Sequence, residues 1–175
     1  MIDNARMRPS FQIRRAERPD LPALHRLVRE LAIYERLEDQ VVSSTDDFER
    51  ALFAPGATVE AVLLRPLGDG KEAEPVAFAL FFHNFSTFLG RRGLYLEDLF
   101  VEPGHRGKGY GKALLIHLAK LAVERGCGRF EWSVLDWNVD AQRFYQGLGA
   151  TVLPDWRITR VTGDALVQLA SRVTT

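Results

Sequence analysis

The most informative stretch of the sequence is Val101-Glu102-Pro103-Gly104-His105-Arg106-Gly107-Lys108-Gly109-Tyr110-Gly111. A strand-like run precedes it, and apolar residues at helical spacing follow it. Glycines let the backbone approach an anion closely, and the first N–H groups of a helix have no acceptor inside the helix. These donors and the helix dipole favour a phosphate. The stretch therefore predicts a strand, an anion-binding turn and a helix, with Arg106 and Lys108 adding positive charge.

Other glycine-rich motifs fit this turn less well. A P-loop requires Ser or Thr after Gly-Lys, but Ala113 follows Gly111-Lys112. In the dinucleotide fingerprint the third glycine comes three residues after the second, whereas Gly107, Gly109 and Gly111 alternate. A glycine-rich turn without a ligand is the plain alternative. The flanking strand, the following helix and the two cations favour the ligand site over it.

The rest of the chain predicts a mixed α/β order, a meander of strands followed by a strand–helix–strand unit. Helices are expected from Leu21 to Leu31, from Ser44 to Phe53, from Ala113 to Ala122 and from Asn138 to Tyr145, with a last helical turn from Gly163. Strands are expected at Phe11–Ala16, Ala57–Leu64, Pro75–Phe85, Leu94–Val101 and Phe130–Leu135, with two short ones within Ala150–Val161 and a loop at Pro66–Glu74. Alternation puts Leu94, Leu96 and Asp98 on one strand face, and Tyr95, Glu97 and Leu99 on the other.

Composition limits the classes of protein to consider. With 175 residues the chain fits one domain, predicted at 11–171 behind a flexible tail at 1–10. Its net charge of +0 gives no sign of a nucleic-acid partner. The longest apolar run, Val76 to Phe82, is too short to span a bilayer, and we do not expect the first ten residues to form a signal peptide. The lone Cys127 and the spacing of the histidines predict no metal site, and we expect a cytoplasmic protein.

The turn and its surroundings resemble the GNAT acetyltransferases. The stretch from Arg106 to Gly111 matches the coenzyme A signature Gln/Arg-x-x-Gly-x-Gly/Ala of that family. The run from Leu94 to Pro103 leads into it as the fourth strand does there, and Asn138 and Phe144-Tyr145 match a downstream segment. The resemblance extends from about Phe11 to about Leu169. It is strongest to the spermidine/spermine (diamine) acetyltransferases, through Glu30–Glu35, Leu94–Asp98, Trp137-Asn138, Phe144-Tyr145 and Trp156-Arg157.

The resemblance implies a fold and a cofactor site. The GNAT acyltransferase fold has a central, mostly antiparallel, twisted sheet flanked by helices on both faces, and its fourth strand carries a bulge. Acetyl-coenzyme A is the implied co-substrate, without a metal. The residues expected to bind it are Leu99, Phe100, Val101, Arg106, Gly107, Lys108, Gly109, Tyr110, Gly111, Lys112, Asn138 and Tyr145.

Two residues are expected to be catalytic. Attack on a thioester needs a neutral amine, and a free alkylamine has a pKa of about 10.4, so a group must accept its proton. Glu97, just before the turn, is predicted to accept it directly or through a water, although a solvent-facing strand glutamate would look the same. A phenol can protonate the departing thiolate, and the resemblance gives this role to Tyr145. Without the resemblance, Tyr145 reads as a core residue beside Phe144.

The expected acceptor is a small amine. Seven acids and one base lie between Glu30 and Glu49, which favours a multiply protonated substrate or, alternatively, a solvated helix face. The resemblance adds Glu35, Glu97, Asp98 and Trp156 as substrate-binding residues and implies a homodimer. A di- or polyamine is the first prediction, and a lysine-like amino acid such as thialysine the second. A non-catalytic acyl-coenzyme A sensor is the alternative from another functional class.

Overall fold

The computed structural model describes residues 10–68 and 71–172. The expected N-terminal tail lies outside these residues except for Ser10. The chain divides into two compact units, one ending at Ser133 and the other beginning at Val134. The first unit contains the sheet and the glycine-rich turn, and each unit is described by itself below.

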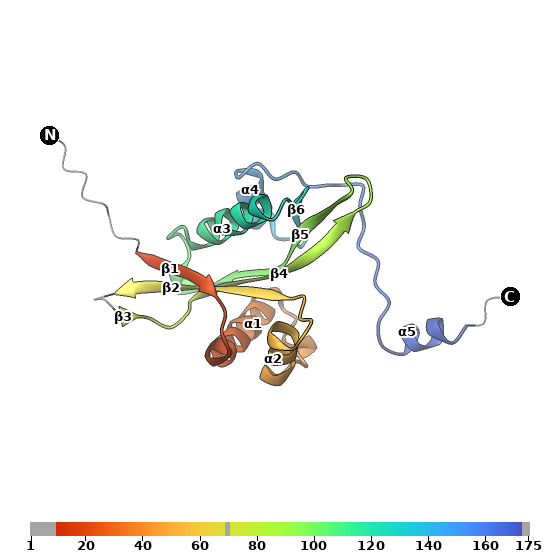
Figure 1. Cartoon of the computed structure of the whole chain (residues 1–175), viewed down its shortest axis with the longest axis horizontal. Coiled ribbons are helices and arrows are strands. Elements are labelled where there is room, and N and C mark those ends of the chain that lie inside the picture. Colours follow the sequence, from red (N-terminus) through yellow and green to blue (C-terminus); the bar gives the residue numbers. More distant parts are fainter. Residues whose placement is uncertain (1–9, 69–70, 173–175) are drawn as a thin grey trace. The chain divides into compact units, whose positions relative to one another are not determined.

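The first unit is built on a sheet whose strand order is β1-β2-β4-β5-β6 (Figure 1). These strands are β1 Phe11–Arg15, β2 Glu60–Gly68, β4 Ala77–Ser86, β5 Arg91–Val101 and β6 Phe130–Trp132, and β3 Lys71–Glu72 pairs with the end of β2. Within the described residues the strands pair in antiparallel fashion, except β5 and β6, which are parallel. The mostly antiparallel sheet expected from the resemblance is therefore confirmed.

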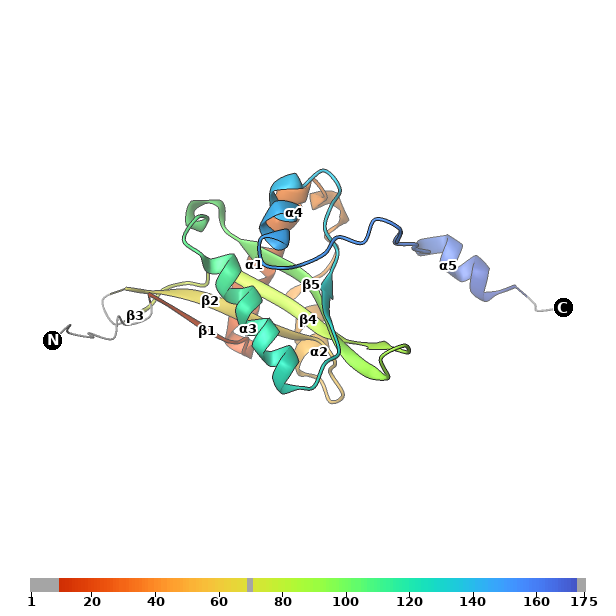
Figure 2. The same cartoon turned by 90° about the horizontal axis from the view of Figure 1, so that it is seen from above.

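Helices cover both faces of this sheet (Figures 1 and 2). Helices α1 Leu21–Glu35 and α2 Thr45–Phe53 lie on one face, and α3 Tyr110–Glu124 lies on the other. Short 3-10 helices stand at Arg18–Asp20, Glu38–Gln40 and Pro103–His105. On the α1 side the core joins helix and strand residues, which are Leu24, Leu27, Leu31, Leu63, Phe78, Leu80 and Phe100. Burial of these side chains from several elements is what fixes the helices against the sheet.

A buried ion pair fixes the start of α1. Asp20 is only 3% exposed, and it accepts hydrogen bonds from Nη1 and Nη2 of Arg14 at 2.8 and 2.9 Å. Arg65 and the Glu17 amide also donate to it. These donors hold the pKa of Asp20 below its ordinary value although burial of the carboxyl opposes them. The network ties β1, β2 and α1 together.

A β-bulge in β5 changes the predicted strand faces. Phe81 pairs with Leu96 and Leu80 pairs with Asp98, so Glu97 is an extra residue without an opposite partner. Directly opposed residues share a face of a sheet. Leu96 therefore lies on the α3 side with Phe81, while Asp98 lies on the α1 side with Leu80. The prediction that Leu94, Leu96 and Asp98 share one face was wrong, because a single inserted residue reverses the alternation after it.

Several element boundaries also differ from the prediction. The segment Pro66–Glu74 is not only a loop, because β2 continues to Gly68 and pairs with β3. The strand predicted at Phe130–Leu135 ends at Trp132. Both differences arise because strand pairing, which local sequence does not specify, decides where a strand ends.

The second unit contains two helices. They are α4 Val139–Gln146 and α5 Gly163–Ala170, and both were anticipated, the second as one turn only. The two short strands predicted within Ala150–Val161 were wrong: this part of the chain has no helix or strand and one turn at Pro154–Asp155. An extended segment becomes a strand only when a neighbour accepts its backbone hydrogen bonds. No such pairing is recorded for it within the described residues.

Candidate active site

The glycine-rich turn has the backbone geometry of an anion site. After the 3-10 helix at Pro103–His105, Gly107 and Gly109 adopt φ values of +76° and +80°, a conformation that residues with a Cβ rarely take. Gly109 is the N-cap residue of α3, so the first free N–H groups of that helix begin beside it. A Cβ built on either glycine meets nothing within 4 Å. This open, amide-lined turn fits the diphosphate of coenzyme A.

Two side chains anchor the turn from within the first unit. Tyr110 is 7% exposed and makes an edge contact with Phe11, with ring centroids 5.5 Å apart. Its other neighbour is the ring of His105, which stacks on it at 6.3 Å. Arg106 turns toward α1, where its guanidinium carbon lies 4.3 Å from the centre of the Tyr34 ring. The backbone amides of the turn, more than the Arg106 side chain, are therefore left to face an anion.

Strand β5 has an open edge where the thioester is expected. It pairs with β6 only from Leu94 to Leu96, while its pairing with β4 continues to Val101. From the bulge at Glu97 onward, the β6 side of β5 lacks a strand partner within the described part of the chain. Backbone groups of Leu99 and Val101 on this edge of β5 are therefore not used in strand pairing with β6 and can serve a ligand. Phe100, by contrast, is 3% exposed and packs into the core.

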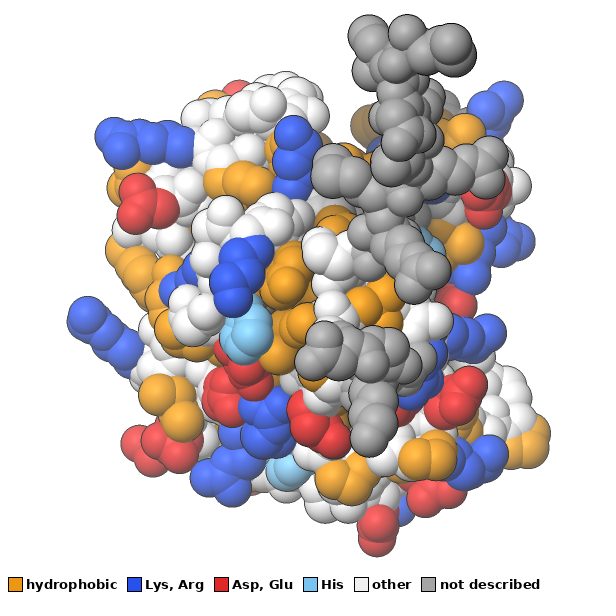
Figure 3. All heavy atoms as spheres, turned by 90° about the vertical axis from the view of Figure 1, so that its left-hand side faces the viewer, with side chains coloured by type: hydrophobic (Ala, Val, Ile, Leu, Met, Phe, Trp, Pro, Cys, Tyr) orange, Lys and Arg blue, Asp and Glu red, His pale blue; other side chains and the backbone are white. Residues whose placement is uncertain are grey.

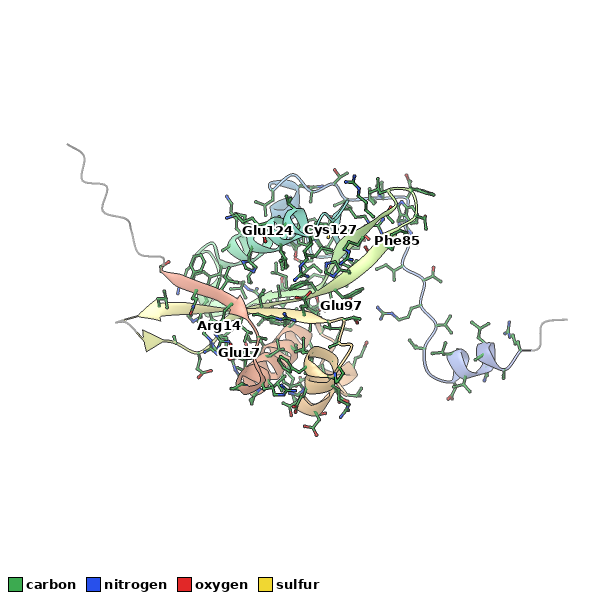
Figure 4. All side chains as sticks on the ribbon, in the orientation of Figure 1. Arg14, Glu17, Phe85, Glu97, Glu124 and Cys127 are labelled. Carbon is green, nitrogen blue, oxygen red and sulfur yellow. The ribbon has the colours of Figure 1, made fainter. Side chains whose placement is uncertain are left out.

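Three carboxylates gather where α1 ends and β5 bulges. Glu97 is exposed at mid-sheet on β5, away from the hairpin end marked by Phe85 (Figure 4). Burial, followed by the charges of Glu97 and Glu35, raises the pKa of Asp98 to about 6. Burial also raises the pKa of Glu35, the last residue of α1. Elsewhere charges are mixed, and Figure 3 shows acidic and basic side chains interspersed over one side of the molecule. The cluster is thus a local feature, suited to a cation.

The remaining candidate residues belong to the second unit. Asn138 caps α4, because its side-chain oxygen accepts a hydrogen bond from the Ala141 amide at 3.3 Å. Tyr145 lies near the end of the same helix with its ring 5.4 Å from that of Phe144. Trp156 is 76% exposed. The cap predicted at Asn138 is confirmed, and the catalytic role of Tyr145 stays a prediction.

Sequence reasoning missed two features of the site. The contact of Arg106 with Tyr34 joins residues that are far apart in the chain, and no local sequence pattern predicts it. The partial burial of Asp98 follows from the bulge, which alternation does not reveal. An exposed-looking Glu-Asp pair inside an otherwise apolar strand was the only available signal.

Comparison with known proteins decides the family. The model of the Acetyltransferase (GNAT) family matches residues 24–150, which include the turn, the bulged strand and α4. The chain belongs to the GNAT family. Members of this family use acetyl-coenzyme A as co-substrate.

GNAT relatives with named activities match nearly the whole chain. L-ornithine N5-acetyltransferase NATA1 of Arabidopsis thaliana is 34% identical over 89% of this chain and 86% of its own. Thialysine N-epsilon-acetyltransferase of Bos taurus is 37% identical over 91% and 97%. The human spermidine/spermine N(1)-acetyltransferase-like protein 1 is 28% identical over 91% of this chain and 24% of its own. Among solved structures, an integron cassette protein from V. cholerae has a TM-score of 0.75 and 27% identity, covering 94% of this chain and 100% of that one.

These relatives confirm an acyl-coenzyme A-dependent N-acyltransferase that acts on amines, and they give no support to a non-catalytic sensor. Among the described residues, no three His, Cys, Asp or Glu side chains are arranged so that they could hold a metal ion. None of the helices in the described ranges combines the length and apolarity needed to cross a membrane.

Proposed function

We propose that this enzyme acetylates a terminal primary amine of a small molecule that carries at least two amino groups. The carboxylate cluster of Glu35, Glu97 and Asp98 carries this proposal, because two protonated amines complement several negative charges better than one does. The similarity to the ornithine and thialysine enzymes favours a basic amino acid as the first acceptor class, which reverses the order predicted from the sequence. Polyamines are the second acceptor class. The chain is also similar to the spermidine/spermine-like protein, but at a lower identity than to the ornithine and thialysine enzymes.

The donor is proposed to be held by the glycine-rich turn. Amides of residues 106–112 would bind the diphosphate, and Lys108, exposed in the turn, would add positive charge. When bound, acetyl-coenzyme A supplies the thioester carbon that the amine attacks. The N–H groups of Leu99 and Val101, at the open edge of β5, would polarise its carbonyl. Asn138 would contribute from the start of α4.

Glu97 is proposed as the general base. Its carboxylate is exposed, and the bulge turns it out of the regular strand pairing, where a substrate ammonium group can reach it. It would accept the proton directly or through a water, after which the neutral amine attacks the acetyl carbon. Tyr145 would then donate the phenolic proton to the departing thiolate, and the proton that the new amide nitrogen loses would restore the phenol. Trp156 is proposed to contact the acceptor.

A panel of acceptors tests this function. Release of free coenzyme A would be measured with ornithine, thialysine, lysine, putrescine, spermidine and a monoamine of similar length. We expect transfer to the diamino acids and diamines, and at least about tenfold lower kcat/KM for the monoamine, since loss of one charge-assisted contact costs about 1.5 to 3 kcal/mol. Equal use of the monoamine would refute the role assigned to the carboxylates. Glu35→Gln should reduce the preference for the second amine, with Glu38→Gln as the matched exposed control.

We also propose that the protein forms a homodimer and acts in the cytoplasm. Residues 11–171 are proposed to form a single domain. Apolar side chains of the second unit are highly exposed, including Leu153 at 59%, Ile158 at 73% and Val167 at 69%. A series of exposed apolar residues often marks a protein interface. The family match runs across the boundary between the units, which favours one domain. Light scattering after gel filtration tests the dimer, and a monomeric mass at micromolar concentration would refute it.

A further inference from the structure

One face of α1 holds both ends of the turn that leads into α3. Arg26, Glu30 and Tyr34 are spaced by four residues and so lie on the same side of the helix. The Nη1 group of Arg26 donates to Glu30 at 2.7 Å and also to the carboxylate of Glu102. Its Nη2 group donates to the carbonyl of Pro75 at 3.0 Å. These hydrogen bonds hold Glu102, the residue just before the 3-10 helix Pro103–His105, against α1.

The other end of the turn is held by Tyr34. The guanidinium carbon of Arg106 lies 4.3 Å from the centre of the Tyr34 ring and 5.7 Å from that of Phe100. The Nε group of Arg106 donates to the carbonyl of Val101 at 3.0 Å, which closes the turn on the strand that precedes it. A cation above an aromatic face at this distance is attracted by the ring. Arg106 is therefore restrained by two different forces, one along the chain and one from α1.

The restraint on Arg106 matters because two flexible glycines, Gly107 and Gly109, follow it. Gly107 and Gly109 follow Arg106 and have no side chain that packs, so their backbone has many conformations of similar energy. Amide groups bind an anion well only when they already point toward it, because ordering them on binding costs free energy. Arg106 is the last residue with a side-chain anchor before these glycines, and Lys108 between them is exposed. The contact with Tyr34 thus limits the conformations of the turn.

We propose that Tyr34 is a positioning residue for the acyl donor, acting through Arg106 on the amides of the glycine-rich turn. This inference rests on the proposed role of the turn in binding the donor. It separates Tyr34 from its neighbour Glu35, which belongs to the carboxylate cluster for the acceptor. Two consecutive residues at the end of α1 then serve the two substrates.

Calorimetric titration of coenzyme A into the protein without acceptor tests the proposal. Tyr34→Leu, which removes the ring, is expected to raise the Kd by about 2-fold to 30-fold, the range that corresponds to a cation–π contact. Tyr34→Phe keeps the ring and should therefore bind coenzyme A more tightly than Tyr34→Leu does. Ile33→Ala, at an exposed position one residue earlier, is the matched control and should have no effect.

Steady-state kinetics and a second variant distinguish loss of donor positioning from a folding defect in Tyr34→Leu. A merely structural role for Tyr34 would lower the Tm and the active fraction, hence kcat, whereas a positioning role raises the KM for acetyl-coenzyme A with a smaller change in kcat. If Tyr34→Leu does not fold, Arg106→Met removes the same contact together with the hydrogen bond to Val101 and one positive charge, and should raise the Kd at least as much. In a double variant the two effects should be less than additive. Unchanged affinity in the single variants, additive effects, or equal weakening by Tyr34→Phe would overturn the proposal.

The outcome also distinguishes this inference from the function on which it rests. If the unchanged protein does not bind coenzyme A, the proposed role of the turn fails. If it binds coenzyme A and Tyr34→Leu binds equally well, only the role of Tyr34 fails.

Discussion

Replacement of Asp98 by asparagine should stabilise the free enzyme in a pH-dependent way. The pKa of this carboxyl is raised from 3.8 to about 6 by burial and by the charges of Glu97 and Glu35. At about 1.4 kcal/mol for each pH unit, the ionised form destabilises the fold by up to about 3 kcal/mol. Asparagine has nearly the same shape and no charge. For a chain of this size the gain corresponds to a rise in Tm of up to roughly 10 °C.

The sign and the pH window follow from the direction of the shift. Because the folded protein holds the Asp98 proton more tightly than the unfolded chain, stability falls as pH rises from about 4 to about 6. The gain in Asp98→Asn should therefore be complete above pH 6 and absent near pH 4. Calorimetric Tm values at pH 4, 6 and 8 measure it, with Asp39→Asn as the exposed control. An equal rise in Tm at all three pH values, or no rise at pH 8, would refute the claim that ionised Asp98 destabilises the fold.

Three other changes test the site. Glu97→Gln should lower kcat by about 100-fold or more at pH 7 and progressively less toward pH 10, where free amine is abundant; an equal loss across a pH–rate profile argues against a base. Tyr145→Phe should lower kcat about 10-fold to 100-fold with little change in the Kd for coenzyme A, and unchanged turnover in the same assay would remove Tyr145 from the mechanism. Gly109→Ala forces a Cβ into a φ of +80°, so chemical denaturation should show a loss of about 1 to 2 kcal/mol, and coenzyme A should bind more weakly; wild-type values for both would contradict the strained turn.

The sequence predicted those parts of the structure that local patterns specify. The glycine-rich turn and a helix beginning close behind it were anticipated, because glycine spacing and helical periodicity are properties of neighbouring residues, although α3 begins at Tyr110 and not at the predicted Ala113. The Asn138 cap was anticipated for the same reason. The end of β2, the missing strands within Ala150–Val161 and the length of β6 were not. Each depends on a strand partner, and the partner is chosen by the whole fold.

In the candidate site too, the sequence predicted local features but not those that depend on distant residues. Glu97 and Asp98 could be singled out as acids within an apolar strand, but their environments could not be told apart. The distinction comes from the bulge, a register shift between Leu80 and Phe81 that involves a strand distant in sequence. Likewise, the stacking of Arg106 on Tyr34 depends on the packing of α1 against the end of β5.

The bulge explains how two consecutive carboxylates can serve different purposes. In a regular strand Glu97 and Asp98 would point to opposite faces, and one of them would be directed toward α3, far from Glu35. The extra residue instead keeps Asp98 on the α1 side, where burial and Glu35 raise its pKa, and leaves Glu97 exposed. A bound dication would offset the repulsion among the three acids, so acceptor affinity should rise as Asp98 ionises around pH 6. The energy stored in the free enzyme is then released on binding, which favours acceptors with two positive charges over those with one.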